Sequence, residues 1–541
     1  MKFCNPSRLL LAVLFLLSNF PFAQAQTITS PEIDKLVERT MATFQVPGIA
    51  VAVVKDGKVV HMKGYGVNSL STGEKTNEHT LFGVASNTKA FTAASLGLLV
   101  EEGKIKWDDK VVKYIPEFRL YNDYVTAEFT IRDLLTHRSG LGLGAGDLML
   151  FPDGNDFTAN DLIRNIQYLK PVSDFRLKYD YDNLLYIVAG EVVARVTGTS
   201  WSDFTEKRIL QPLGMTRSAA SYERLRDPSN TIEAHAVVEG NLKVIDRYNL
   251  PFGAAAGGIY TSVHDLSKWL LMLMNEGRYG DDLKQGLLTQ KVIREQWTPQ
   301  TIIPYHGKSP FNTHFRSYGL GWFLSDVKGH KEVSHTGGLP GMVSQVTMLP
   351  ELNLGIIVLT NQQNGQAFRS ITNTIKQAYL GMEAHDWVAE LKKEEDEYIA
   401  EATAYTDMIW ADVNKVLKEK KSKVAFDNYV GTFEDKWFGH VEIYRQKNKL
   451  YFKSLRSPRL QGEMLYYKDN TFVVKWTDRT FEADAFVVFV PDQEGKLSGI
   501  SMKAVSPLTD FSYDFHDLDF TRVQAVPQSS AIPAAKRKQG L

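Results

Sequence analysis

A serine, a lysine, a tyrosine and a histidine stand in short segments that together could form a nucleophile with its proton-transfer partners. Ser86 and Lys89 are three residues apart at the start of a predicted helix over residues 87–102, so we expect both side chains on one face of that helix. The positive field at a helix N-terminus favours a developing alkoxide on Ser86. Lys89 can accept a proton at neutral pH only if it is desolvated or near another cation, and Phe82 and Phe91 make an apolar surrounding plausible.

The S-x-x-K pattern is short, and about two chance matches are expected in a chain of this length. The second match runs from Ser325 to Lys328. Ser325 lies at the end of a predicted strand over residues 318–324, next to a turn at Gly329, where side chains three apart need not converge. Context therefore favours the first match, although a serine at a helix start is also an ordinary N-cap, and this alternative stays open for Ser86.

The second segment with candidate chemistry contains Tyr181 and Asn183, directly before a predicted helix over residues 184–196. The phenol has an ordinary pKa near 10 and could shuttle a proton if a nearby ammonium lowered that pKa. The alternative is structural, with a half-buried tyrosine and an asparagine that caps the helix.

The third segment runs from His335 to Gly341 and leads into a predicted strand over residues 343–349. Its glycines let a substrate backbone approach closely. The backbone amides of Gly338 and Ser86 could together form an oxyanion hole. Taken alone, a histidine in a glycine turn is as compatible with a structural role.

The sequence lacks G-x-S-x-G, H-E-x-x-H, C-x-x-C and G-x-x-x-x-G-K-[ST] motifs. Residues 140–146 are rich in glycine but do not form a dinucleotide fingerprint. We therefore predict no metal and no cofactor.

The three segments, in this order and at these separations, resemble the superfamily of serine β-lactamases, penicillin-binding proteins and esterases. The resemblance is closest to the class C-related (CubicO-type) branch, with S-x-x-K, Y-x-N and H-x-G boxes, and residues 134–141, 211–215 and 256–260 match as well. It covers roughly residues 30–380. It implies an α+β fold, with an antiparallel sheet flanked by helices and a helical subdomain.

The resemblance also implies a role for each candidate residue. Ser86 is the acylated nucleophile, Lys89 its base, Tyr181 the proton donor to the leaving group, and Asn183 a hydrogen-bonding partner of the substrate amide. His335 takes the place of a lysine in penicillin-binding relatives, with Thr336, Gly337 and Gly338 beside it as substrate-binding residues. Histidine is only partly charged at neutral pH, so a histidine in place of the lysine weakens the expected recognition of a substrate carboxylate.

Composition places the chain among ordinary globular proteins. The 541 residues contain 62 basic and 63 acidic side chains, so no general attraction to nucleic acid or anionic lipid is expected. Residues 1–25 read as a signal peptide, with a basic start, an apolar run too short to span a bilayer, and a small-residue cleavage site ending at Ala25. The only cysteine, Cys4, precedes that run, so a disulfide is not expected. We expect a periplasmic or secreted protein.

Changes in composition and in the expected secondary structure along the chain predict four segments after the leader. A hydrolase domain covers residues 26–385, a charged helical linker 386–425, an all-β barrel 426–525, and a polar tail expected to be disordered 526–541. Short strands are predicted in the third segment at 429–433, 440–445, 449–453, 464–468, 471–476, 485–490, 497–505 and 511–520. This segment resembles the lipocalin-like domain of some peptidases in the branch. It is expected to limit access and help assembly, to act as a passive stability domain, or to bind an apolar ligand.

Together these features predict an exported serine hydrolase that acts through an acyl-enzyme on peptides or other amides, including those with D-residues. An esterase or β-lactamase with the same Ser-Lys-Tyr machinery is the first alternative. A non-catalytic penicillin-binding or sensor protein is the second. Expected partners are a small-molecule or peptide substrate, without nucleic acid or membrane insertion, and a homo-oligomer stays open.

Overall fold

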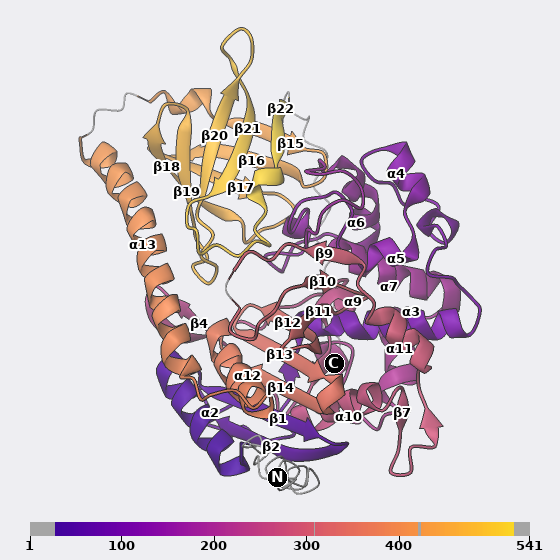
Figure 1. Cartoon of the computed structure of the whole chain (residues 1–541). Helices are drawn as coiled ribbons and strands as arrows, with labels where there is room; N and C mark the ends of the chain where they lie inside the picture. The colour runs from indigo at the N-terminus through magenta and orange to yellow at the C-terminus, as the bar shows by residue number, and fades with distance from the viewer. Residues whose placement is uncertain (1–27, 308, 420–423, 524–541) are drawn as a thin grey trace, which may run out of the picture.

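A computed structural model describes residues 28–307, 309–419 and 424–523. It contains an α+β domain, a long helix and a closed β-barrel (Figure 1). The predicted fold class is therefore confirmed. The predicted leader at residues 1–25 and the predicted tail at 526–541 lie outside the described residues.

One antiparallel sheet of eight strands forms the centre of the α+β domain. Its order brings strands from both ends of the domain side by side, because β1 pairs with β14. In spatial order the strands are β2 (Lys58–Gly66), β1 (Gly48–Lys55), β14 (Leu354–Thr360), β13 (Met342–Leu349), β12 (His330–Leu339), β11 (Phe323–Val327), β10 (Arg316–Tyr318) and β9 (Thr301–Ile303).

Helices cover both faces of this sheet, and the alternation of β1 side chains shows how. Ile49, Val51 and Val53 pack with helices α2 (Ser30–Phe44) and α12 (Gly365–Tyr379). The intervening Ala50 and Ala52 belong to the core on the opposite face, together with most of the helical region. Both faces are apolar, which is why β1 is buried along nearly its whole length.

The helical region on the second face carries most of the candidate site. Phe91 of α3 stacks on Trp269 of α10, with ring centroids 4.2 Å apart. The helices of this region are α3 (Thr88–Glu101), α4 (Asp123–Glu128), α5 (Ile131–Leu134), α6 (Ala159–Asn165), α7 (Leu184–Thr197), α8 (Trp201–Thr205), α9 (Ala254–Gly257), α10 (Val263–Met274) and α11 (Gln290–Gln296). Short strand pairs join β3 (Phe82–Gly83) to β6 (Tyr260–Thr261), β4 (Ala234–Val238) to β5 (Asn241–Ile245) and β7 (Arg278–Tyr279) to β8 (Gln285–Gly286).

Two predicted elements of this domain are wrong. The predicted strand over residues 318–324 is the end of β10, a turn and the start of β11. At Gly321 in that turn φ is +80°, and an added Cβ would lie 2.9 Å from the Lys89 carbonyl oxygen, so the turn packs tightly against α3. The predicted glycine turn after His335 is instead the second half of strand β12, and the chain reverses only at Pro340 and Gly341.

The segment predicted as a charged helical linker contains one continuous helix, α13 (Trp387–Glu419), of 33 residues. Its N-terminal part packs Trp387 and Leu391 against the apolar core of α2 and α12. Farther along, Ile409 and Val413 pack on barrel side chains. In Figure 1, α13 runs along one side of the molecule from α2 up to the barrel.

The C-terminal domain is a closed antiparallel barrel of eight strands, in which β22 pairs back with β15. Buried aromatic rings fill its interior, including Tyr429, Phe472 and Phe489 with centroids 4.8–5.8 Å apart, which weighs against the apolar-ligand expectation. The strands are β15 (Gly431–Asp435), β16 (Gly439–Gln446), β17 (Lys449–Ser454), β18 (Gln461–Lys468), β19 (Thr471–Trp476), β20 (Ala485–Pro491), β21 (Leu497–Ala504) and β22 (Asp519–Val523).

The eighth barrel strand was predicted wrongly, and the error falls on a segment that contacts the hydrolase domain. Residues 511–520 are mostly a loop with a 3₁₀ turn at Phe515–Asp517, and β22 begins only at Asp519. Within this loop, the buried carboxylate of Asp514 accepts hydrogen bonds from the backbone amides of Gly146 (2.6 Å) and Leu148 (2.9 Å). The barrel is thereby joined to the helical region of the hydrolase domain.

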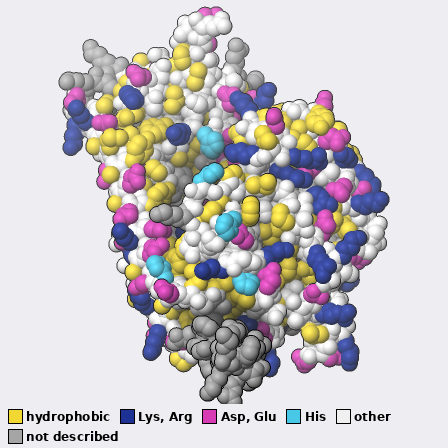
Figure 2. Space-filling view, in the orientation of Figure 1, with side chains coloured by type: hydrophobic (Ala, Val, Ile, Leu, Met, Phe, Trp, Pro, Cys, Tyr) yellow, Lys and Arg dark blue, Asp and Glu magenta, His cyan; other side chains and the backbone are white. Residues whose placement is uncertain are grey.

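Acidic and basic side chains both occur across the face seen in Figure 2. Among the described residues, no helix has the length and apolar character needed to cross a bilayer.

Candidate active site

Ser86 lies in a short 3₁₀ turn, Ala85–Asn87, which leads directly into α3. The preceding residue, Ala85, has a positive φ of 49°, which is uncommon for a residue with a side chain. The turn presents Ser86 to a cavity and places it at the start of α3. Its backbone therefore has the geometry of a helix N-terminus, as the spacing predicted.

Lys89, the second residue of α3, is fully buried. Its Nζ atom donates to Ser86 Oγ (3.0 Å), to Asn183 Oδ1 (2.7 Å) and to the backbone oxygen of Ala256 (3.0 Å). Burial lowers the pKa of Lys89 to about 7, against the opposing influence of two acidic side chains, Asp147 and Asp182. A substantial fraction of Lys89 is therefore neutral near pH 7 and able to accept a proton.

Asn183 does not act as the helix cap considered from the sequence. Its Oδ1 accepts from Lys89, while its Nδ2 donates to Asp147 Oδ2 at 2.7 Å. Capping of α7 comes from its neighbour instead, because Asp182 Oδ1 accepts from the backbone amide of Leu185 (3.3 Å). Asn183 thus links Lys89 to a buried carboxyl group.

Tyr181 lies at the wall of the cavity that Ser86 also lines. Its ring packs near His137, with centroids 4.2 Å apart, and Lys89 Nζ lies 4.8 Å from its centroid. Desolvation raises the pKa of Tyr181 well above its usual value, although the neighbouring Ser86 side chain opposes this. The condition considered from the sequence, a pKa lowered by a nearby ammonium, is therefore not met, and the phenol is neutral at physiological pH.

His335 lies on β12 and is buried. Its Nδ1 faces the carbonyl oxygen of Thr336 (2.6 Å), which can only accept, so Nδ1 carries the hydrogen and Nε2 accepts from the Tyr318 hydroxyl (2.8 Å). Burial, together with the nearby Lys89, lowers the pKa of His335 to about 3. His335 is neutral at physiological pH and supplies no positive charge to the site.

The three residues after His335 differ in their relation to the cavity. Thr336 and Gly338 line it. Gly337 is buried, and an added Cβ would lie 2.1 Å from the carbonyl oxygen of Val84. Gly337 therefore lets β12 pack against the segment that carries Ser86, which is a packing role rather than the predicted contact with substrate.

Three buried side chains around the site were not found from the sequence. Burial raises the pKa of Asp182 to about 7 and raises that of Asp147 well above its usual value. His137, at a positive φ of 52°, accepts the Asp182 amide hydrogen on Nδ1 (3.1 Å), and burial lowers its pKa. His137 does lie in a segment that supported the family resemblance, whereas Asp147 follows the glycine-rich loop and carries no motif.

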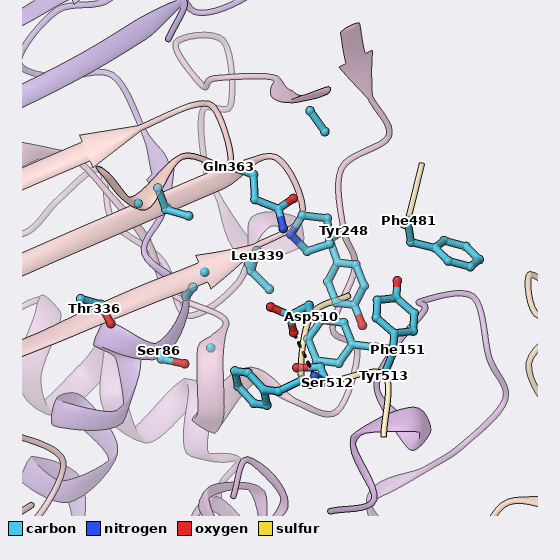
Figure 3. A pocket seen from close by; sticks show the side chains of 18 of the residues that line it. Ser86, Phe151, Tyr248, Thr336, Leu339, Gln363, Phe481, Asp510, Ser512 and Tyr513 are labelled. Atoms are coloured by element: carbon cyan, nitrogen blue, oxygen red, sulfur yellow. Dashed lines mark hydrogen bonds between the residues drawn. The ribbon is translucent and has the colours of Figure 1, made fainter. Parts of the chain in front are cut away.

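One cavity of about 1130 Å³ is shared by both domains. Ser86, Tyr181, Asn183 and His335 line it on the hydrolase side. The barrel contributes Arg459, residues 480–482 and part of the β21–β22 loop. Figure 3 shows Ser86 and Thr336 at one end and a group of aromatic side chains at the other, with Asp510 between them. The predicted site residues therefore converge on one cavity, with Lys89 directly behind Ser86.

Within the described ranges, no group of three or more His, Cys, Asp and Glu side chains is arranged to hold a metal ion. The polar groups at Ser86 are instead an amine, a phenol and backbone amides. These groups supply a nucleophile with proton-transfer partners.

Comparison with solved structures gives the same fold. The chain is similar to the octameric penicillin-binding protein homologue from Pyrococcus abyssi, with a TM-score of 0.57 and 21% identity, covering 92% of this chain and 100% of that one. A class C β-lactamase superposes with a TM-score of 0.51 and 21% identity, covering 65% of this chain and 96% of that one. At these identities the likeness establishes the fold alone.

Curated relatives match over part of the chain. Unguisins hydrolase ungD of Aspergillus violaceofuscus is 29% identical over 402 residues, which is 69% of this chain and 70% of that protein. Protein flp of Staphylococcus aureus is 27% identical over 336 residues, or 61% of this chain and 62% of that protein. The chain thus spans less than two thirds of the length of Flp.

Two family models match the chain. One, described as a domain of unknown function (DUF3471), matches residues 417–522, the barrel region. The other, described as beta-lactamase, matches residues 33–380 and so covers more than half of the sequence. Together with the fold and the geometry at Ser86, this match shows that the chain belongs to the beta-lactamase family of serine hydrolases.

Proposed function

We propose that this protein hydrolyses peptides or other amides through an acyl-enzyme formed on Ser86. The observation that carries the proposal is Lys89, fully buried with Nζ 3.0 Å from Ser86 Oγ and with its pKa lowered to about 7. A neutral amine in that position removes the serine proton as the hydroxyl oxygen attacks a carbonyl carbon. The same lysine in water would be protonated and unable to act as a base.

The remaining groups provide for the other steps of acyl transfer. The backbone amides of Ser86 and Gly338 would stabilise the oxyanion of the tetrahedral intermediate. Tyr181, a neutral phenol, would give its proton to the departing amine or alcohol and recover one from the Lys89 ammonium. Water, deprotonated by the same pair, would then attack the acyl carbon and regenerate Ser86.

The open edge of β12 supports an extended amide as the substrate. β11 pairs with β12 only as far as Ser334, while β13 pairs with it to Leu339. One edge of residues 335–339 is therefore not paired with another described strand, and Thr336 and Gly338 of this stretch line the cavity. An extended peptide can hydrogen-bond along such an edge. Asn183 has one amide hydrogen left for the substrate after donating to Asp147.

Hydrolysis of β-lactams or of esters that carry a carboxylate is the second candidate, and Arg316 favours it. His335 is neutral, but the exposed guanidinium of Arg316 lines the same cavity and forms no ion pair with another described residue. An unpaired guanidinium is suited to bind a carboxylate.

A panel of an aryl ester, a D-aminoacyl amide and a cephalosporin, each assayed with the parent and with Arg316→Gln, separates these candidates. Turnover of the amide with little dependence on Arg316 supports the peptidase proposal. Turnover restricted to esters, or to cephalosporin with loss in Arg316→Gln, contradicts it.

We also infer export to the periplasm or the medium, on the composition of residues 1–25. N-terminal sequencing of the protein recovered from its native host tests this inference. A mature chain that begins near Gln26 supports it, and an intact Met1 in the cytosolic fraction contradicts it.

A further inference from the structure

Two stacked aromatic pairs, one from each domain, face each other across the end of the cavity away from Ser86. Phe151 and Tyr248 of the hydrolase domain have ring centroids 4.8 Å apart and planes inclined by 21°. Phe481 and Tyr513 of the barrel have centroids 5.3 Å apart, also at 21°. All four rings line the cavity that contains Ser86 (Figure 3). We call these four residues the aromatic chamber.

The two halves of the aromatic chamber are held together by Arg459 of the barrel. Its guanidinium forms ion pairs with Asp153, two residues after Phe151, and with Asp478 at 2.7 Å. It also donates to Thr480 Oγ1 (3.0 Å), next to Phe481. The rings are therefore fixed relative to one another before any ligand binds, which lowers the entropy cost of binding.

The charges near the aromatic chamber exclude one class of ligand. Among the described residues that line the cavity, only Arg316 and Arg459 are basic, and Arg459 is already matched by two carboxylates. Asp246, Glu482 and Asp510 also line the cavity, and they are acidic. An anionic group in the chamber would meet unfavourable charge, whereas a neutral apolar group would bury its surface against the rings.

We propose that the aromatic chamber binds an uncharged aromatic or branched aliphatic group of the substrate, so that the preferred substrates are amides and esters carrying such a group. The inference rests on the proposed function, because it concerns the specificity of hydrolysis at Ser86. It assigns half of the specificity site to the barrel, through Phe481 and Tyr513. A bound phenyl group should raise kcat/KM by about 10- to 100-fold over a methyl group, from the apolar area it buries.

Two substrate series test the inference on either side of the scissile bond. In the first, p-nitrophenyl esters carry acetyl, glutaryl, hexanoyl or 5-phenylpentanoyl groups. In the second, acetate esters of ethanol and 3-phenylpropanol are followed by release of acid. The expected result is a rise of at least about tenfold in kcat/KM from the small to the phenyl substrate in one series or the other, and no gain for glutaryl over acetyl.

Variants then assign the preference to the chamber. Phe481→Ala and Tyr513→Ala should reduce the phenyl-to-methyl ratio of kcat/KM to within about threefold of unity. Thermal melting shows whether the alanine variants fold. If Phe481→Ala does not fold, Phe481→Leu replaces it, because leucine keeps most of the side-chain volume without the aromatic ring. Tyr451→Ala is the matched control, since Tyr451 stacks on Tyr444 in the same barrel and does not line the cavity. It should keep the parent ratio.

The phenyl-to-methyl ratio of kcat/KM decides whether the aromatic chamber sets the specificity. A flat ratio in both series, a preference for glutaryl, or a phenyl preference that survives in the Phe481 and Tyr513 variants overturns the inference. Failure of the acyl-enzyme mechanism at Ser86, on which the inference rests, gives a different result, because ester turnover would then be absent or would survive Ser86→Ala. A flat ratio with Ser86-dependent turnover refutes only the chamber.

Discussion

The Nζ atom of Lys89 lies 2.7 Å from Oδ1 of Asn183, closer than the 3.0 Å that separate it from Ser86 Oγ. Asn183 in turn donates to the buried Asp147. An amide between the amine and the carboxyl keeps the two from forming a direct ion pair, which would hold the lysine protonated. The arrangement orients Lys89 towards Ser86 while leaving its pKa low.

The activity should depend on pH with one acidic limb. Lys89 must be deprotonated to accept the serine proton, and its pKa is about 7, so kcat/KM should rise as pH increases through about 7 and fall below it. His335, with a pKa of about 3, stays neutral in this range and adds no limb. The measurement is kcat/KM for p-nitrophenyl acetate from about pH 5 to about pH 9. A profile that is flat through neutrality would contradict this role for Lys89.

Replacement of Lys89 by arginine should abolish turnover while keeping a cation. An arginine side chain is not deprotonated in proteins, so Lys89→Arg leaves Ser86 without a base, and we expect a loss of several orders of magnitude in kcat. Lys328→Ala is the matched control, because Lys328 belongs to the second S-x-x-K match and lies in a turn after β11. Comparable turnover in Lys89→Arg and Lys328→Ala would eliminate the lysine from the mechanism.

Removal of the Tyr181 hydroxyl should slow acyl transfer while preserving the fold. Tyr181→Phe keeps the ring contacts with His137 and Phe511 but loses the proton donor, so we expect kcat to fall by about 10²- to 10⁴-fold. Tyr179→Phe removes the hydroxyl of another tyrosine on the same cavity wall and should have little effect. Equal rates for the two variants, measured with one ester and one amide, would assign no proton transfer to Tyr181.

Loss of Asp514 should affect both stability and activity, although it belongs to the barrel. Asp514→Ala leaves two buried backbone amides, of Gly146 and Leu148, without their acceptor, at a cost of about 2 kcal/mol or more. Because these amides flank Asp147, kcat should also fall. Asp519→Ala removes an exposed ion pair to Lys170 across the same interface and should change little. The measurements are the melting temperature and kcat of both variants. Full activity in Asp514→Ala would show that this barrel residue does not influence the active site.

Local patterns explain why much of the fold could be predicted. Strand β19, at Thr471–Trp476, is recovered residue for residue because β-branched and aromatic side chains fill it and a turn precedes it. The i,i+3 spacing of Ser86 and Lys89 likewise fixes their relation on one turn of helix. By contrast, the stretch 511–520 is β-rich in composition but is mostly a loop. Asp510, just before it, accepts a hydrogen bond from the Ser512 amide, and Asp514 within it accepts from two backbone amides of the hydrolase domain.

Burial and pKa values could not be predicted in this way, because they depend on segments that are distant in the sequence. The raised pKa of Tyr181 depends on burial by residues from both domains, including Phe511 of the barrel. The roles of Asp147 and Asp514 arise because a barrel loop reaches the turn after the glycine-rich segment. No local sequence pattern indicates the contact of Tyr181 with Phe511 or the hydrogen bonds of Asp514 to the hydrolase domain.

Labelling of Ser86 tests the central claim most directly. The protein is treated with a fluorophosphonate probe, which reacts with activated serines, and its intact mass and peptides are measured alongside those of Ser86→Ala. We predict one added probe mass, located on Ser86, with labelling that falls below about pH 7 as Lys89 becomes protonated. Labelling that persists in Ser86→Ala, or an unlabelled parent at alkaline pH, would contradict the account.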